Sequence, residues 1–108
     1  MIKLKDILSE VVSKSVVKNL MLNKNAKVIE AEYVFRSGKK EKEKFKVKKI
    51  YETNNFYMIA VGRDRPRAKE HNNFEFVIDK NKLTIRFRAK MGMMTNQLSD
   101  KILSLKMR

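Results

Sequence analysis

The hydrophobic positions at the start of the chain recur every three or four residues, which is the period of an amphipathic helix. The stripe runs through residues 3–22, and charged side chains fall between its members. Its apolar positions are Leu4, Ile7, Leu8, Val11, Val12, Val16 and Leu20. Asn23 and Asn25 follow as stop signals, because asparagine tolerates the left-handed conformation that ends many helices. The pattern predicts an N-terminal helix that packs its apolar stripe on a sheet.

From residue 27 onward the period changes to two, which is the period of a half-buried strand. The inward positions of two such segments are Ile29, Ala31, Tyr33 and Phe35, followed by Phe45, Val47 and Tyr51. The polar stretch 37–43 between them predicts the turn of an antiparallel hairpin. Pairing about residue 40 would place Tyr33 opposite Val47 and Glu32 opposite Lys48, which are both favourable pairs.

Two further strand segments follow. Residues 56–61 are apolar on both faces, which is typical of a central strand covered on both sides. Beyond them, apolar alternation runs up to a turn at 79–82 and away from it again, which predicts a hairpin with Lys80 and Asn81 at its tip. Its expected cross-strand pairs are Ile78 with Leu83, Phe76 with Ile85, Phe74 with Phe87, and Glu75 with Arg86.

The C-terminal segment changes period once more. Gly92 interrupts the alternation within a cluster of methionines, and Thr95 is a suitable N-cap. The apolar positions that follow, Leu98, Ile102 and Leu105, predict a short helix running to the C-terminus. We therefore expect one α+β domain over residues 1–108, with an N-terminal helix, about five antiparallel strands that can curl into a small barrel, and a short C-terminal helix.

Composition narrows the class of protein. The chain has 108 residues, 43% of them hydrophobic, which suits a single domain with a real core. It contains no cysteine, so disulfides and thiolate metal sites are excluded and a reducing compartment is favoured. Its first residues do not resemble a signal peptide, and no uncharged apolar run reaches the roughly 18 residues of a membrane span. We expect a cytoplasmic protein, with nucleoid association as a further possibility.

Charge is the strongest functional signal. Lysine and arginine number 26 against 12 acidic residues, for a formal net charge of +14. A small domain needs a net charge of only about 2 to 8 in magnitude to be soluble, so the excess indicates a polyanionic partner. Nucleic acid is the first candidate. An anionic membrane surface, an acidic protein and the lysine-rich composition of an AT-rich genome remain as alternatives.

The aperiodic stretch 62–73 contains the first of three basic features. Four cations, Arg63, Arg65, Arg67 and Lys69, fall within seven residues around the only proline of the chain. Arginine suits phosphate because its planar guanidinium can bond two oxygens at once. The alternative is a solvated loop whose charges pair with Asp64 and Glu70.

The second basic feature runs from the turn of the first hairpin into its second strand. It consists of Lys39, Lys40, Lys42, Lys44, Lys46, Lys48 and Lys49. Strand alternation would place Lys44, Lys46 and Lys48 on one face, spaced roughly 6 to 7 Å apart, which is close to the phosphate spacing of a nucleic-acid strand. A solvated face that protects the strand from edge pairing is the alternative. The third feature is Arg86 and Arg88 on the outer face of the last hairpin. Arg88 is the candidate binding residue of the two, because Arg86 is expected to neutralise Glu75.

Candidate catalytic residues are sparse. His71 is the only histidine, and the sequence has no nucleophile elbow, phosphate-binding loop or dinucleotide motif. We therefore expect no enzyme, no metal and no cofactor. The enzymatic alternative is a metal-independent ribonuclease that uses Arg65, Arg67, Lys69 and His71.

These features together predict a nucleic-acid-binding protein that grips phosphates, with duplex DNA placed somewhat ahead of RNA. Base stacking would fall to Tyr51, Phe56 or Tyr57, although core packing is the competing role for all three. Size and composition suit a regulator or accessory factor of the kind that phages and mobile elements encode, by analogy alone. The main rival is a protein-interaction module that docks on an acidic surface of a larger nucleic-acid enzyme. The oligomeric state is left open.

Overall fold

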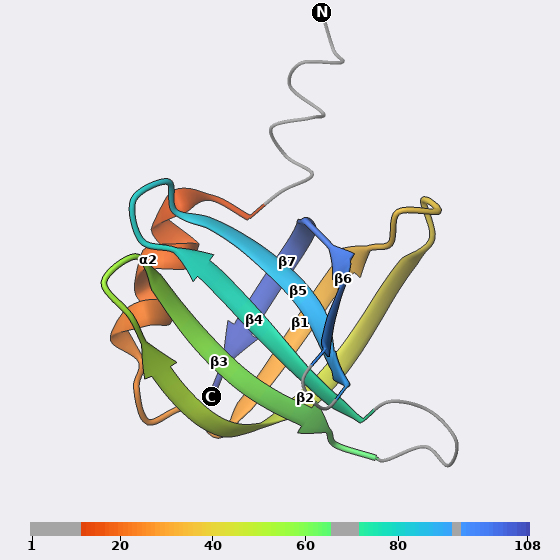
Figure 1. Cartoon of the computed structure of the whole chain (residues 1–108), viewed down its shortest axis with the longest axis horizontal. Coiled ribbons are helices and arrows are strands. Elements are labelled where there is room, and N and C mark those ends of the chain that lie inside the picture. Colours follow the sequence, from red (N-terminus) through yellow and green to blue (C-terminus); the bar gives the residue numbers. More distant parts are fainter. Residues whose placement is uncertain (1–11, 66–71, 92–93) are drawn as a thin grey trace, which may run out of the picture.

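The computed structural model describes residues 12–65, 72–91 and 94–108 (Figure 1). Within these ranges the chain forms one helix followed by seven strands. They are α2 (Lys14–Leu22), β1 (Val28–Val34), β2 (Lys40–Glu52), β3 (Phe56–Arg63), β4 (Asn73–Asp79), β5 (Thr84–Met91), β6 (Met94–Ser99) and β7 (Lys101–Met107). All paired strands are antiparallel, in the order β6-β5-β4-β3-β2-β1-β7.

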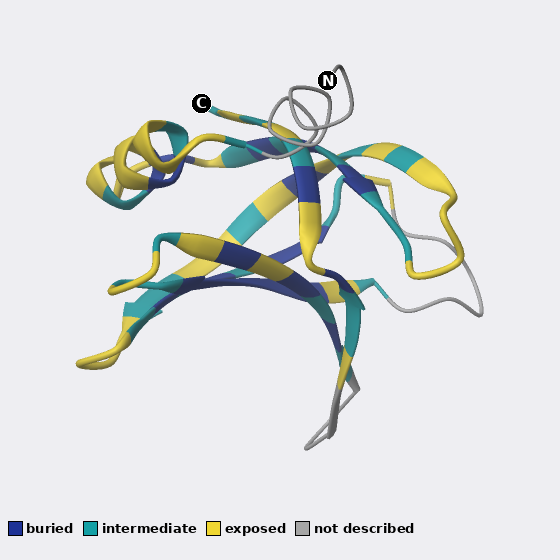
Figure 2. Ribbon diagram, turned by 90° about the horizontal axis from the view of Figure 1, so that it is seen from above, coloured by how far each residue is buried: buried dark blue, intermediate teal, exposed yellow. Residues whose placement is uncertain are grey.

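The sheet curls into a half-barrel, which Figure 2 shows from above. Strands β6 and β7 stand at opposite ends of the strand order, yet only Asp100 separates them in the chain. The buried Ser99 fixes this corner: its hydroxyl donates to the carbonyl of Val34 (2.5 Å) and accepts from the N–H of Lys101 (3.1 Å). A side chain on β6 therefore ties the corner to β1 and brings the two ends of the sheet together.

The core fills the concave face of this sheet. Phe87 is fully buried at its centre, and four other aromatic rings lie with their centroids 4.6–5.3 Å from its own. These rings belong to Tyr33, Phe45, Phe74 and Phe76. Burial of each large apolar side chain contributes roughly 1.5–3 kcal/mol to the stability of the fold. The alternating apolar residues of five strands therefore determine which face of the sheet is turned toward the core.

Helix α2 packs beside the barrel with Val17 and Leu20 buried. The N-cap is Ser13, whose hydroxyl accepts from the N–H of Val16 (3.3 Å), and the C-cap is Asn23, one of the two expected stop signals. The helix was predicted over residues 3–22. Residues 1–11 lie outside the described ranges. Residues 12 and 13 are described but not helical, and the helix begins at Lys14.

The predicted α+β class, with about five strands and a C-terminal helix, is wrong, because the fold is mainly β and residues 94–107 form β6 and β7. The misleading helical spacing has two sources. Leu98 and Ile102 lie on either side of the corner at Asp100, so their spacing of four spans two strands. Leu103 is skipped in the pairing of β7 with β1, and this bulge gives the spacing of three between Ile102 and Leu105. A second bulge skips Leu98 in the pairing of β6 with β5.

The predicted register of the first hairpin is also wrong. Tyr33 lies opposite Glu41, and Glu32 lies opposite Lys42. Strand β2 starts at residue 40, within the expected turn, because residues 35–39 suffice to reverse the chain. In this turn the N–H of Phe35 donates to the carbonyl of Lys39 (2.9 Å), and Gly38 adopts a positive φ of 91°.

The predicted register of the second hairpin is wrong as well. Phe76 lies opposite Phe87, and Glu75 lies opposite Arg88 rather than Arg86. The loop between the strands spans residues 80–83, not a two-residue tip. The side chain of Asp79 accepts from two loop N–H groups, and Leu83 adopts a positive φ of 56° to re-enter the sheet.

Strand β3 is central, as predicted, but it is not covered equally on both faces. Tyr57, Ile59 and Val61 are buried, whereas the alternate residues Phe56, Met58 and Ala60 are only half-buried. The less covered side is the outer face of the sheet, opposite the core.

Candidate nucleic-acid interface

The lysines of β2 lie on the outer face of the sheet. Lys40, Lys42, Lys44 and Lys46 are all exposed, and they alternate with core-side positions. Their neighbours on β1 differ along the strand: Glu32 lies opposite Lys42 and Glu30 opposite Lys44, whereas Lys46 faces Val28. Positive charge is therefore partly balanced beside β1 and accumulates toward the far end of β2. Lys39, in the preceding turn, is also exposed.

A bulge at Lys48 concentrates three lysines at this end. Val47 pairs with Val61 and Lys49 pairs with Ala60, so Lys48 is the extra residue. The phase of the strand changes at this point: Ile50 turns inward, and Lys49 and Tyr51 turn outward. The prediction that Tyr51 faces the core is thus wrong. Its ring instead lies 5.6 Å from the ammonium of Lys49, on the outer face.

Strand β5 supplies the other cations of this face. Arg86 and Arg88 lie opposite Val77 and Glu75, and Lys90 follows at the next outward position. Together with β2 they form a set that we call the outer basic patch: Lys46, Lys48, Lys49, Arg86, Arg88 and Lys90. Lys90 was not among the residues predicted from the sequence, although its spacing of two from Arg88 and four from Arg86 indicated that it faces outward with them.

Glu75 is the anionic centre of the patch and is 0% exposed. It accepts hydrogen bonds from the hydroxyl of Tyr51 and from Arg88, whose Nε lies 2.9 Å from Oε1, and the Lys90 ammonium lies 3.6 Å from Oε2. Burial raises the pKa of this carboxyl. The hydrogen bonds and the two cations outweigh burial and hold its pKa below the ordinary value.

Tyr51 shows the opposite effect. Burial, followed by the hydrogen bond to Glu75 and the negative charge of that group, raises the pKa of Tyr51 to about 12. Its hydroxyl is therefore a donor to Glu75 at neutral pH. The shared carboxylate orients Tyr51, Arg88 and Lys90 relative to one another on the outer face.

The predicted arginine loop is only partly described. The side chain of Arg63 is 13% exposed, pairs with Glu43, and places its guanidinium carbon 4.9 Å from the ring centroid of Phe74. Arg65 is exposed, and Asp64 lies 4.0 Å from Lys46. Arg67, Lys69 and His71 lie outside the described residues, so their proposed roles stay predictions.

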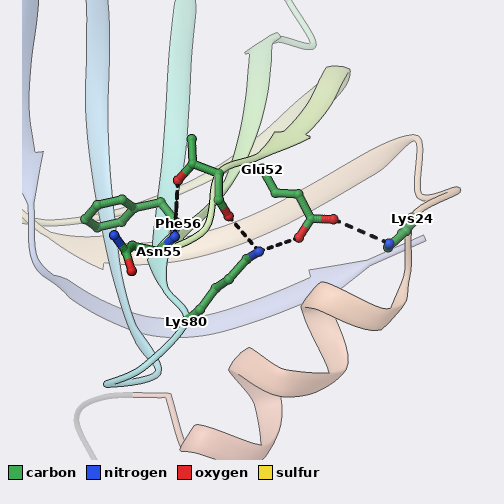
Figure 3. Close-up of polar contacts among 6 residues, drawn as sticks. Lys24, Glu52, Asn55, Phe56 and Lys80 are labelled. Carbon is green, nitrogen blue, oxygen red and sulfur yellow. Dashed lines mark hydrogen bonds and ion pairs between the residues drawn. The ribbon is translucent and has the colours of Figure 1, made fainter.

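A second polar cluster lies where strands β2 and β4 end, and it has a structural role (Figure 3). The ammonium of Lys80 donates to the carbonyl of Thr53 (2.7 Å) and contacts Glu52 (2.6 Å), whose other oxygen lies 3.6 Å from Lys24. The hydrogen bond and charge of Lys80 lower the pKa of Glu52. These cations join the β2–β3 turn, the β4–β5 loop and the end of α2, and are not part of the outer basic patch.

The described residues contain no group of three or more histidine, cysteine or carboxylate side chains placed to hold a metal ion. In the same part of the chain, no helix has the length and apolar character needed to cross a bilayer. Comparison of the whole chain with protein-family models, curated proteins and solved structures finds no match.

Proposed function

We propose that this protein binds nucleic acid through the outer basic patch, mainly by contacts to phosphate. The observation that carries the proposal is the position of six cations on the outer face of one sheet, three on β2 and three on β5, with β3 and β4 between them, in a chain with a formal net charge of +14. Among the described residues, Glu75 and Asp64 are the carboxylates in ion-pair contact with the patch, and its six cations outnumber them.

The shape of this face supports phosphate contact more than base reading. Strands β3 and β4 lie between the two cationic strands, and β3 presents the small Ala60 and Gly62 on this face. Helix α2 does not offer a recognition helix, because Val17 and Leu20 are buried against the sheet. The exposed lysines of β2 follow one another at strand spacing, about 6–7 Å, near the spacing of successive phosphates in a nucleic-acid strand. We keep duplex DNA as the first candidate ligand and RNA as the second.

The test is a fluorescence-anisotropy titration of duplex DNA, single-stranded DNA and RNA of matched length, over a series of salt concentrations. The variant is Lys46→Gln/Lys49→Gln/Arg86→Gln, which removes three exposed cations of the patch. Its control is Lys14→Gln/Lys18→Gln/Lys101→Gln, which removes three exposed lysines of α2 and β7. Each lysine or arginine that no longer neutralises a phosphate should reduce the slope of log affinity against log salt on duplex DNA by about 0.9.

We expect the patch variant to lose at least about tenfold in affinity, and the control to lose about threefold or less, since a distant charge contributes only through the screened field. Equal losses in the two triple variants would reject the patch as the interface. Absence of binding to all three nucleic acids near physiological salt would reject the function. The rival, docking on an acidic protein surface, would then be tested by salt-dependent binding to one protein partner.

A further inference from the structure

The outer face carries a hollow of about 310 Å³ between the two cationic strands. Its lining consists of Lys48, Ala60, Val61, Asn73, Phe74 and Lys90. The hollow lies where Lys46, Gly62 and Asn73 are cross-strand neighbours, so β3 contributes its smallest residues to the floor. Lys48 on β2 and Lys90 on β5 thus line the hollow from two sides, with the small Ala60 of β3 between them.

Gly62 explains the position of Lys48. A Cβ atom at residue 62 would lie 2.6 Å from Cε and 3.1 Å from Nζ of Lys48, which is closer than side-chain carbons approach. The missing side chain lets Lys48 lie across β3 and donate to Oδ1 of Asn73 (2.5 Å). Since the amide oxygen accepts this bond, the Nδ2 group of Asn73 is a donor on the same wall of the hollow.

The surroundings of the hollow keep a positive balance. Lys90 lies 3.6 Å from Glu75, but that carboxylate also receives Arg88 and the hydroxyl of Tyr51. Lys48 pairs with a neutral amide, which leaves its charge uncompensated by that contact. Two cations, Arg88 and Lys90, therefore share one buried carboxylate, and Lys48 adds a third positive charge to the wall of the hollow, so an added anion would be attracted.

We propose that this hollow binds one phosphate group, with the ammonium groups of Lys48 and Lys90 and the amide of Asn73 as its ligands. Three converging donors, two of them charged, are suited to the oxygens of a single tetrahedral anion. We take the phosphate group to be a phosphodiester of a bound nucleic acid, and to that extent the inference rests on the proposed function. Free phosphate presents the same chemistry, and the experiment separates the two sources.

Inorganic phosphate is titrated into the full chain at constant ionic strength, and amide chemical shifts are measured by NMR. Binding of duplex DNA to the same variants is measured in parallel by fluorescence anisotropy. We expect saturable shifts centred on Lys48, Gly62, Asn73 and Lys90. Lys48→Met and Lys90→Met should each weaken phosphate binding about tenfold, because a charge-assisted hydrogen bond is removed. Lys106→Met, an exposed strand lysine on β7, is the control for the loss of one charge and should change affinity less than about twofold.

Gly62→Ala tests the geometry without changing the charge. The new methyl group would displace the flexible end of Lys48, so we expect phosphate affinity to fall at least about fivefold while the variant stays folded. If these variants also weaken duplex DNA binding, the hollow holds a phosphodiester. If DNA affinity is unchanged while phosphate binding is lost, the hollow holds free phosphate.

Two results would overturn the inference: shifts spread evenly over the lysines of the sheet, or a Lys106→Met effect equal to that of Lys48→Met. Retained DNA binding in that case would leave the proposed function standing. Conversely, localised phosphate binding without any binding of nucleic acid would support the hollow and reject the proposed function.

Discussion

Arg88 and Glu75 are direct cross-strand partners on the outer face, and the guanidinium donates from Nε and from a terminal nitrogen to the same carboxylate oxygen. The other oxygen receives the hydroxyl of Tyr51 and faces Lys90. A fully buried carboxylate on β4 thus contacts Arg88 and Lys90 on the adjacent β5 and, across β3, Tyr51 on β2.

The first prediction concerns the stability that Glu75 provides. Glu75→Gln keeps the shape of the side chain but leaves Arg88 without its counter-charge, so we expect a loss of about 2 kcal/mol in the free energy of unfolding. Urea denaturation measures it. The control is Glu32→Gln, which changes a half-buried carboxylate on β1 and should cost clearly less. Equal costs would contradict the central role of Glu75.

The second prediction concerns acid. The pKa of Glu75 is lower in the folded protein than the roughly 4.3 of an unfolded glutamate. The stability linked to its charge is therefore present above about pH 4.3 and is lost as pH falls through the lower folded value. Unfolding free energies measured from neutral pH to acid should fall less steeply in Glu75→Gln than in the unchanged protein. Parallel curves would argue against this linkage.

The third prediction concerns alkaline titration. Burial raises the pKa of all three tyrosines, Tyr33, Tyr51 and Tyr57, and that of Tyr51 reaches about 12. Phenolate absorbance of the native protein should therefore show little ionisation near pH 10, where free tyrosine titrates. Tyr51→Phe should remove the step near 12. A full tyrosine step near pH 10 in the folded protein would count against the contact with Glu75.

The fourth prediction concerns the first hairpin turn. Gly38 adopts a φ of 91°, a conformation that side chains disfavour, although a Cβ there would meet no atom within 4 Å. Gly38→Ala should therefore cost about 1 kcal/mol through backbone strain alone. Thermal unfolding checks this against Ser37→Ala in the same exposed turn, which should be close to neutral. A neutral Gly38→Ala would show that the turn adopts another conformation.

The fifth prediction concerns the corner that closes the half-barrel. Ser99→Ala removes a buried hydroxyl that bonds to Val34 and Lys101, and we expect a cost of about 1–2 kcal/mol. Amide hydrogen exchange should quicken first along β6 and β7, which meet at this corner. Ser104→Ala, an exposed serine on β7, serves as the control and should leave exchange unchanged.

The alternation of apolar residues was enough to assign the core. Phe45, Phe74, Phe76 and Phe87 all face inward, as their spacing predicted. The two hairpin registers were wrong by six and by two residues: Tyr33 meets Glu41 instead of Val47, and Glu75 meets Arg88 instead of Arg86. Because both shifts are even, the wrong pairings by themselves moved no inward residue to the other face, and the error at Tyr51 has a different cause.

Bulges are what the pattern could not show. The extra residues at Lys48, Leu98 and Leu103 each change the phase of a strand. The bulge at Lys48 turns Tyr51 outward, and the bulge at Leu103 together with the corner at Asp100 gives residues 98–105 the spacing of a helix. A bulge is selected by the neighbouring strand and by closure of the sheet, so the local pattern does not distinguish a bulged strand from a helix.

For the candidate interface, the sequence by itself determined the excess of positive charge and the outward row of lysines on β2. Tertiary structure decided which cations come together. It paired Arg63 with Glu43, placed Lys90 beside Glu75, and left Lys48 over Gly62. These contacts join strands that are distant in the chain. Their partners depend on register and curvature, which the whole sheet sets at once, whereas charge and alternation are properties of each segment alone.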